Sequence, residues 1–254
     1  MNLRLLSLFT LILLQSCSSK KNILYVQDID RSNLTELNFE APTIQANDIL
    51  KINVATLEAS AAIPYNKLTD DSGGSSSNLE LMRLEGYEVS KTLTIEFPQL
   101  GTLSVLNKTP TQLAKAIKQR LESEGHLINP SVNVGLLNAK FTVLGEVARP
   151  GTFSFTESKL NLFQAIGLAG DLTINGQRKN IKLIREINQE RTVLHIDLTT
   201  SDWMNSDSYY IFPNDIIIID PNNPKVKSAG FIGNLGTAIS VVSVLLSSII
   251  LLTR

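Results

Sequence analysis

Residues 141–153 read Phe-Thr-Val-Leu-Gly-Glu-Val-Ala-Arg-Pro-Gly-Thr-Phe and decide the fold of the second half of this 254-residue chain. Apolar residues alternate on both sides of Arg149-Pro150-Gly151, which favours a turn, so the stretch predicts a β-hairpin. Apolar residues then recur at helical spacing from Leu160 to Leu168 and end at Gly170, which predicts a short helix. Further strands are predicted at 181–187, 193–198 and 216–219, followed by a linker at 221–224. We therefore expect an α+β module over residues 139–221.

The preceding residues, 42–137, carry a second set of strand and helix patterns. Residues 48–57 are rich in β-branched side chains and predict a strand. Thr109-Pro110 places a capping hydroxyl before a proline, and apolar residues follow at helical spacing until Gly125, which predicts a helix. Shorter strands are predicted at 87–89, 93–97, 101–105 and 132–136. These elements form a first α+β module.

The N-terminus has the pattern of an export signal. Arg4 precedes an apolar run from Leu5 to Leu14, and Leu14-Gln15-Ser16-Cys17 follows, which resembles the lipobox of bacterial lipoproteins. The apolar run is too short to span a bilayer comfortably. We predict a signal peptide at 1–16, lipidation (palmitate) of Cys17, and a lipidated tether at 17–41. The alternatives are an ordinary cleaved signal with a chance cysteine, or an uncleaved anchor.

The C-terminal residues 230–253 carry no charge and predict a transmembrane helix. Leu235–Leu252 would be about 27 Å long, close to the roughly 30 Å of a hydrocarbon core. Small and polar residues fall in one arc of roughly 140° of this helix, although Val244 and Leu251 interrupt it. One interpretation is a single anchor, whose serines bond to their own backbone or which pairs through small residues. The other is a ring of helices around an aqueous lumen, with these pore-lining residues: Thr237, Ser240, Ser243 and Ser247.

Composition and motifs give no sign of catalysis. The 23 Lys and Arg balance 24 Asp and Glu, so the chain has no electrostatic footprint for nucleic acid. A single cysteine excludes an internal disulfide and a four-thiolate metal site. His126 and His195 fall in different modules, which argues against a histidine cluster. We expect no enzyme activity, no metal and no cofactor.

Several of these stretches together resemble the Wza-type outer-membrane polysaccharide-export lipoproteins, over about Thr43 to Pro221 and at both termini. Ile44–Ile52 is similar to the opening strand of their export domain, although Ala46-Asn47 replace its proline and glycine. Residues 97–101, 109–111 and 129–134 are similar to the rest of that domain. Residues 141–153 and 162–172 resemble the β-grasp SLBB module. Only one such module is visible here, whereas longer relatives carry two.

The resemblance implies an α+β chain with two small periplasmic modules, followed by one C-terminal transmembrane helix. It implies a lipid-anchored location in the outer membrane, with most of the chain in the periplasm. The function would be a homo-oligomeric, porin-like channel that exports capsular polysaccharide or exopolysaccharide and meets an inner-membrane polysaccharide co-polymerase. The alternative is a non-pore, glycan-binding periplasmic adaptor lipoprotein, which could be monomeric. We expect the chain to interact with membrane lipid and not with nucleic acid.

Overall fold

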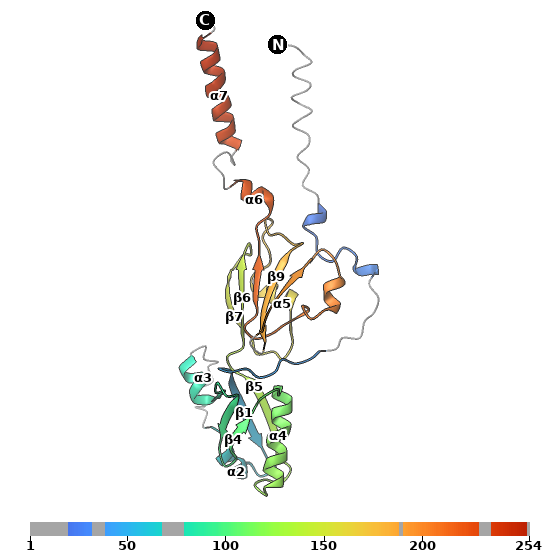
Figure 1. The fold of residues 1–254 in the computed structure, drawn as a ribbon, viewed down its shortest axis with the longest axis vertical. Coiled ribbons are helices and arrows are strands. Elements are labelled where there is room, and N and C mark those ends of the chain that lie inside the picture. Colours follow the sequence, from blue (N-terminus) through green and yellow to red (C-terminus); the bar gives the residue numbers. More distant parts are fainter. Residues whose placement is uncertain (1–19, 32–38, 68–78, 188–189, 229–234, 253–254) are drawn as a thin grey trace.

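The computed structural model describes residues 20–31, 39–67, 79–187, 190–228 and 235–252. These residues build two mixed helix-and-strand modules arranged along the long axis of the molecule, with helix α7 (Leu235–Leu252) at one end (Figure 1). Each module has its own cluster of buried hydrophobic side chains. The predicted α+β class is confirmed.

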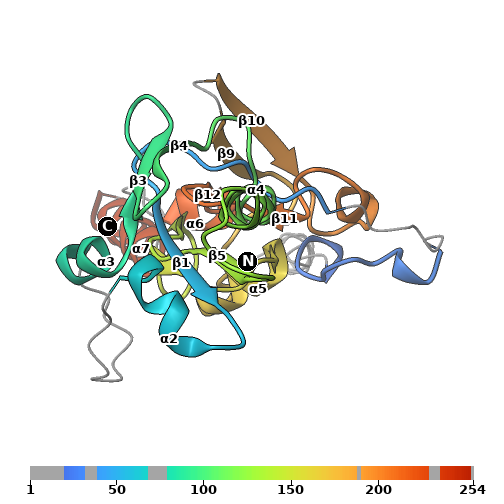
Figure 2. The same ribbon diagram turned by 90° about the horizontal axis from the view of Figure 1, so that it is seen from below.

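The first module is built on a three-stranded antiparallel sheet in the order β2-β1-β5. Its strands are β1 (Ile49–Ala55), β2 (Tyr87–Glu88) and β5 (Ser131–Leu136), and a separate hairpin joins β3 (Thr94–Phe97) to β4 (Gly101–Ser104). Helix α4 (Pro110–Ser123) lies against β5, as the view from below shows (Figure 2). The shorter elements are α2 (Ala59–Ala62), η3 (Ile63–Tyr65) and α3 (Leu79–Glu85).

Helix α4 begins and ends where local chemistry requires. The Thr109 side chain accepts from the Gln112 backbone N–H, and the Gln112 side chain accepts from the Thr109 N–H, so the two residues form a capping box. The helix buries Leu113, Ile117 and Leu121 in the core, and Gly125 follows with φ +74°. The predicted helix is confirmed.

A tight turn over Gln45–Asp48 leads into β1. Asn47 takes φ +68°, a left-handed conformation that asparagine tolerates better than most residues, which explains how it replaces the family glycine. The Gln45 N–H donates to Asp48 Oδ2 at 2.8 Å. Asp48 is only 5% exposed, and this burial raises its pKa to about 6. The turn therefore holds a carboxyl group that resists ionisation.

The second module contains a five-stranded sheet in the order β10-β9-β12-β6-β7. The strands are β6 (Lys140–Gly145), β7 (Gly151–Ser154), β9 (Ile181–Ile187), β10 (Glu190–Ile196) and β12 (Ile216–Ile219). The predicted hairpin is confirmed as β6–β7, with Phe141 opposite Phe153. All pairs are antiparallel except β12 with β6. A two-stranded ribbon of β8 (Leu160–Asn161) and β11 (Tyr210–Ile211) accompanies this sheet.

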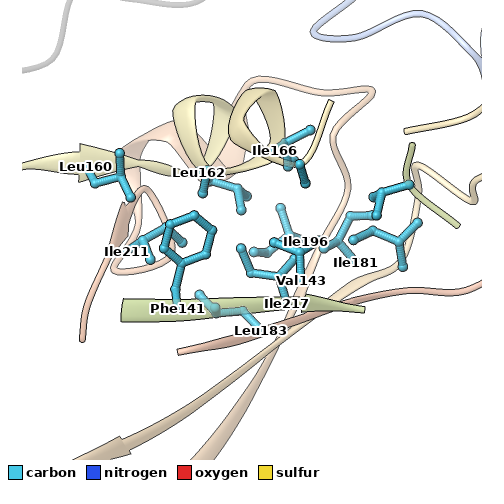
Figure 3. Close-up of a cluster of buried hydrophobic side chains, with 14 of the residues drawn as sticks. Phe141, Val143, Leu160, Leu162, Ile166, Ile181, Leu183, Ile196, Ile211 and Ile217 are labelled. Atoms are coloured by element: carbon cyan, nitrogen blue, oxygen red, sulfur yellow. The ribbon is translucent and has the colours of Figure 1, made fainter. Parts of the chain in front are cut away.

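Helix α5 (Leu162–Leu168) covers the core of the second module (Figure 3). Its Leu162 and Ile166 face Phe141, Val143 and other fully buried side chains of the sheet. Each large side chain buried in this way contributes roughly 1.5–3 kcal/mol. The core thus ties the hairpin, the helix and the later strands into one unit.

Three sequence predictions need correction. The helix predicted from Leu160 begins at Leu162, because Leu160 and Asn161 pair with β11 and Asn161 then caps the helix through Gln164. The predicted linker at 221–224 partly forms α6 (Asn223–Ser228), since Asn222 Oδ1 accepts from the Lys225 N–H. Helix α7 forms as predicted, but no helix in the described ranges is both long and apolar enough to cross a membrane. The transmembrane prediction for residues 230–253 is therefore not supported.

Residues 20–31 lie along the side of the second module (Figure 1). The backbone N–H groups of Val26 and Gln27 donate to the carbonyls of Leu198 and Thr199, both at 2.9 Å. The Tyr25 hydroxyl donates to Asp171 Oδ1 at 2.5 Å. This segment contains two 3₁₀ turns, η1 (Lys20–Asn22) and η2 (Ile29–Arg31). The described part of the predicted tether is therefore docked on the module.

Gly145 is required where β12 meets β6. Its φ is +95°, and a Cβ atom built there would lie 2.0 Å from the Ile219 carbonyl oxygen. That carbonyl accepts the Glu146 N–H at 2.9 Å. We expect Gly145→Ala to lower the free energy of unfolding by about 3 kcal/mol or more, because both the conformation and the strand contact are disturbed.

Denaturant unfolding measures this effect, with Gly151→Ala as the matched control. A Cβ atom at Gly151 meets nothing within 4 Å, so that change should cost less than about 1 kcal/mol. Equal stabilities of the two variants would contradict the role assigned to Gly145.

Asp48 predicts a pH-dependent stability. Its folded-state pKa of about 6 lies above its ordinary value of 3.8. The contribution of protonated Asp48 to the free energy of unfolding is therefore fully present below pH 3.8 and is lost as the pH rises through 6. Asp48→Asn keeps an acceptor for Gln45 but cannot ionise. We expect the variant to gain up to about 3 kcal/mol over the native chain near neutral pH and little near pH 4. Denaturant unfolding across this range tests it, and a pH-independent difference would contradict it.

Candidate functional site

The predicted lipidation residue, Cys17, lies outside the residues that the structure describes. The described chain begins at Lys20, within η1. Lipidation of Cys17 therefore stays a prediction.

The other predicted site residues, Thr237, Ser240, Ser243 and Ser247, all lie in α7. The Ser240 hydroxyl donates to the Gly236 carbonyl, and the Ser247 hydroxyl donates to the Ser243 carbonyl, both at 2.8 Å. These bonds use the hydroxyl hydrogens and leave oxygen lone pairs to accept from water or a ligand. The stripe therefore keeps some polar character even where its serines bond to their own helix.

Aliphatic side chains of α7 are exposed beside this stripe. Ile239, Val241 and Val242 each expose more than half of their surface. A shallow groove of about 440 Å³ runs along Ser243, Val244, Ser247, Ser248 and Leu251. Such a surface is costly to leave in water, so α7 is suited to association with an apolar partner.

The two histidines do not form a site together. His126 lies in the first module near Glu124, with 3.5 Å between Nε2 and Oε2, while His195 in β10 bonds to Asn180 through Nδ1 at 2.6 Å. Across the described ranges no group of three or more potential metal-ligating side chains occurs. The polar chemistry of the described chain therefore lies elsewhere.

A large hollow lies on the second module. It measures about 820 Å³ and is bounded by residues 39–43 and by side chains of β9, β10, β11 and the 3₁₀ turn η4 (Asp202–Asn205). Phe39, Tyr209, Tyr210 and Phe212 supply aromatic rings to its lining, and Glu40 and Asp207 supply carboxylates. A concave, aromatic surface with a few polar groups is typical of a small-molecule or glycan site.

Arg185 fixes one wall of this hollow. Its Nε and Nη2 donate to the two carboxylate oxygens of Asp215 at 3.0 and 2.7 Å, and the side chains are 7% and 1% exposed. The guanidinium also donates to the carbonyls of Asp207 and Tyr210 and lies 3.9 Å from the centroid of Phe212. Burial raises the pKa of Asp215, while Arg185 acts to lower it. The buried pair therefore binds the loop before β12 to β9.

Asp215 ends a turn with the same geometry as the turn before β1. The Phe212 N–H donates to Asp215 Oδ2 at 2.8 Å, as the Gln45 N–H does to Asp48, and Asn214 has φ +68°, as Asn47 has. The sequence analysis marked only the first of these two places, where Ala46-Asn47 stand in place of the proline and glycine of the similar export domain. Asn-Asp-Ile occurs at both places, at 47–49 and 214–216, and that repeat is the signal that would have found the second.

Comparison with known families assigns both modules. Residues 39–137 match the family described as polysaccharide biosynthesis/export protein, and residues 140–197 match the SLBB domain. Each match falls on one of the two modules seen in the structure.

The chain is also similar to curated proteins of Neisseria meningitidis. The chain is similar to the capsule polysaccharide export outer membrane protein CtrA of Neisseria meningitidis serogroup B (strain ATCC BAA-335 / MC58), with 27% identity over 195 residues, 76% of this chain and 47% of that protein. The CtrA protein of serogroup A / serotype 4A (strain DSM 15465 / Z2491) is 26% identical over 193 residues, 75% of this chain and 47% of that protein. The chain spans about half the length of the curated relatives it matches. With an export domain followed by an SLBB domain, this chain belongs to the Wza-type polysaccharide-export family.

Proposed function

We propose that the chain is the subunit of a homo-oligomeric outer-membrane channel that exports capsular polysaccharide or exopolysaccharide from the periplasm. The observation that carries this proposal is the order of the two family domains, which follow one another over residues 39–197. The name of the matched relatives, capsule polysaccharide export outer membrane protein, agrees with it. Such a channel needs a wide polar lumen and no catalytic residue.

The arrangement of the modules supports a ring. They follow one another along the long axis (Figure 1), so copies placed side by side around an axis would form two stacked rings. Most of the chain would then lie in the periplasm. The inner-membrane polysaccharide co-polymerase would meet this assembly, and the lipid on Cys17 would hold it at the outer membrane.

Helix α7 would complete the channel. We assign Thr237, Ser240, Ser243 and Ser247 to the face toward the lumen, and exposed aliphatic residues such as Val242 to the outer face. At 100° per residue, Val242 lies about 160° around the helix from Ser240. The amphipathic division would give each copy a polar inner surface and an apolar outer one.

One observation favours a second function, a non-pore adaptor lipoprotein that binds glycan in the periplasm. Ser240 and Ser247 already bond to the backbone of their own helix, so the stripe does not require a water-filled lumen. An adaptor could work as a monomer, which is the property that separates the two functions.

The first test is the oligomeric state of the full-length, lipidated protein in mild detergent. Single-particle imaging should show closed symmetric rings with a central cavity. Dispersed monomers would contradict the channel and favour the adaptor.

The second test is the side of α7 that meets water. Ser240→Cys should react readily with a charged, water-soluble thiol reagent in the assembled protein, and Val242→Cys should react at least about tenfold more slowly because it lies about 160° around the helix from Ser240. The only native cysteine, Cys17, would be blocked by its lipid. Equal reaction rates at the two positions would contradict the assigned lumen.

A further inference from the structure

A row of contacting, partly buried aromatic side chains runs along the SLBB module. Five successive ring pairs, with centroid separations between 4.7 and 5.9 Å, connect residues from five separate parts of the chain. In order, the row consists of Phe39, Tyr210, Tyr209, Trp203, Phe163 and Tyr25. It contains three of the five tyrosines and the single tryptophan of a chain with few aromatic residues. The fold therefore concentrates aromatic surface on one side of one module.

The Phe39 end of the row opens into the 820 Å³ hollow, which Phe39, Tyr209 and Tyr210 line. A second hollow of about 500 Å³ adjoins it, with Ser206 and Asp207 in both linings, and Trp203 lines this second one. Tyr209 and Tyr210 are half-buried. The rings thus contact the protein on one side while part of their surface faces the hollows.

Trp203 carries an unused hydrogen-bond donor at this place. The residue is 6% exposed, and its Nε1 has no acceptor among the described residues. A buried donor without an acceptor is unfavourable, and an acceptor oxygen of a bound molecule would relieve that cost. The donor and the rings together favour a ligand that offers both apolar faces and oxygen atoms.

The charged side chains that line the hollows favour uncharged ligands over anionic ones. Glu40 and Asp207 line the larger hollow, and Asp197 and Asp202 line the smaller one. Arg185, the guanidinium in the larger lining, is already paired with Asp215. The carboxylates can accept hydrogen bonds from hydroxyl groups, and they repel an anionic ligand.

We propose that the row from Phe39 to Trp203, with its two hollows, binds an uncharged stretch of a polysaccharide. Pyranose rings have apolar C–H faces that stack on aromatic rings, and their hydroxyl groups suit the carboxylates and the indole N–H. This inference deepens the proposed function by assigning where the exported or bound glycan contacts the chain. It applies to a channel and to an adaptor alike.

The only tryptophan of the chain reports on this site directly. We would titrate the full-length protein in detergent with maltohexaose and with cellohexaose and follow the fluorescence of Trp203. We expect a saturable change with at least one of them at millimolar concentration or below. A hexamer of galacturonic acid should bind at least about tenfold more weakly, which corresponds to about 1.4 kcal/mol.

Tyr210 provides the matched variants. Tyr210→Ala removes the ring between Phe39 and Tyr209 and should weaken binding about tenfold, whereas Tyr210→Phe keeps the ring and should bind like the native chain. Thermal unfolding of both variants checks that the module is intact. If Tyr210→Ala does not fold, Phe39→Ala, which lies outside the sheet, makes the same test at the end of the row.

Three results would overturn the proposal: no response to either uncharged sugar, equal binding of the acidic hexamer, or full binding by the intact alanine variants. A fluorescence change that follows protein concentration, and is indifferent to sugar, would place a second copy in the hollow and also overturn it. If imaging shows closed oligomers but no sugar binds, the channel proposal holds and the glycan site is wrong. If sugar binds but the protein is monomeric, the glycan site holds and the channel proposal is wrong.

Discussion

The parallel pairing of β12 with β6 is the contact on which the SLBB module depends. These strands are distant in sequence, and their pairing places β12 in the middle of the five-stranded sheet. It places Ile217 and Ile219 in the buried core of the module and positions the turn that ends at Asp215 beside Arg185. Because the Ile219 carbonyl passes so close to Gly145, only glycine permits this pairing at the end of β6.

The same pairing shapes the surface that we assign to the glycan. Once Asp215 is held by Arg185, the guanidinium also binds the carbonyls of Asp207 and Tyr210, so the loop between β10 and β12 is fixed against β9. That loop carries Trp203, Tyr209 and Tyr210, the centre of the aromatic row. A buried ion pair contributes little to stability by itself, but breaking one is costly, and here it determines the position of a binding surface.

The two modules use the same turn before a core strand, but the buried aspartates of the two turns have different electrostatic surroundings. Each begins a core strand with a turn that ends in Asn-Asp-Ile, and each turn buries its aspartate. Asp215 has a guanidinium partner, whereas Asp48 has no paired cation among the described residues, and burial raises its pKa to about 6. The chain therefore carries a pH-sensitive group in the export module and a charge-paired one in the SLBB module.

Local patterns in the sequence determined the β6–β7 hairpin, helix α4 with its capping box, the α+β class and the polar stripe of α7, because each depends on neighbouring residues. The same local patterns were enough to recognise the resemblance to the polysaccharide-export family. Tertiary structure alone decided the pairing of β12 with β6, the Arg185–Asp215 pair, and the docking of residues 25–27. It also decided the aromatic row, because Phe39, Trp203 and Tyr210 show no common pattern along the chain and meet only after strands distant in sequence have paired.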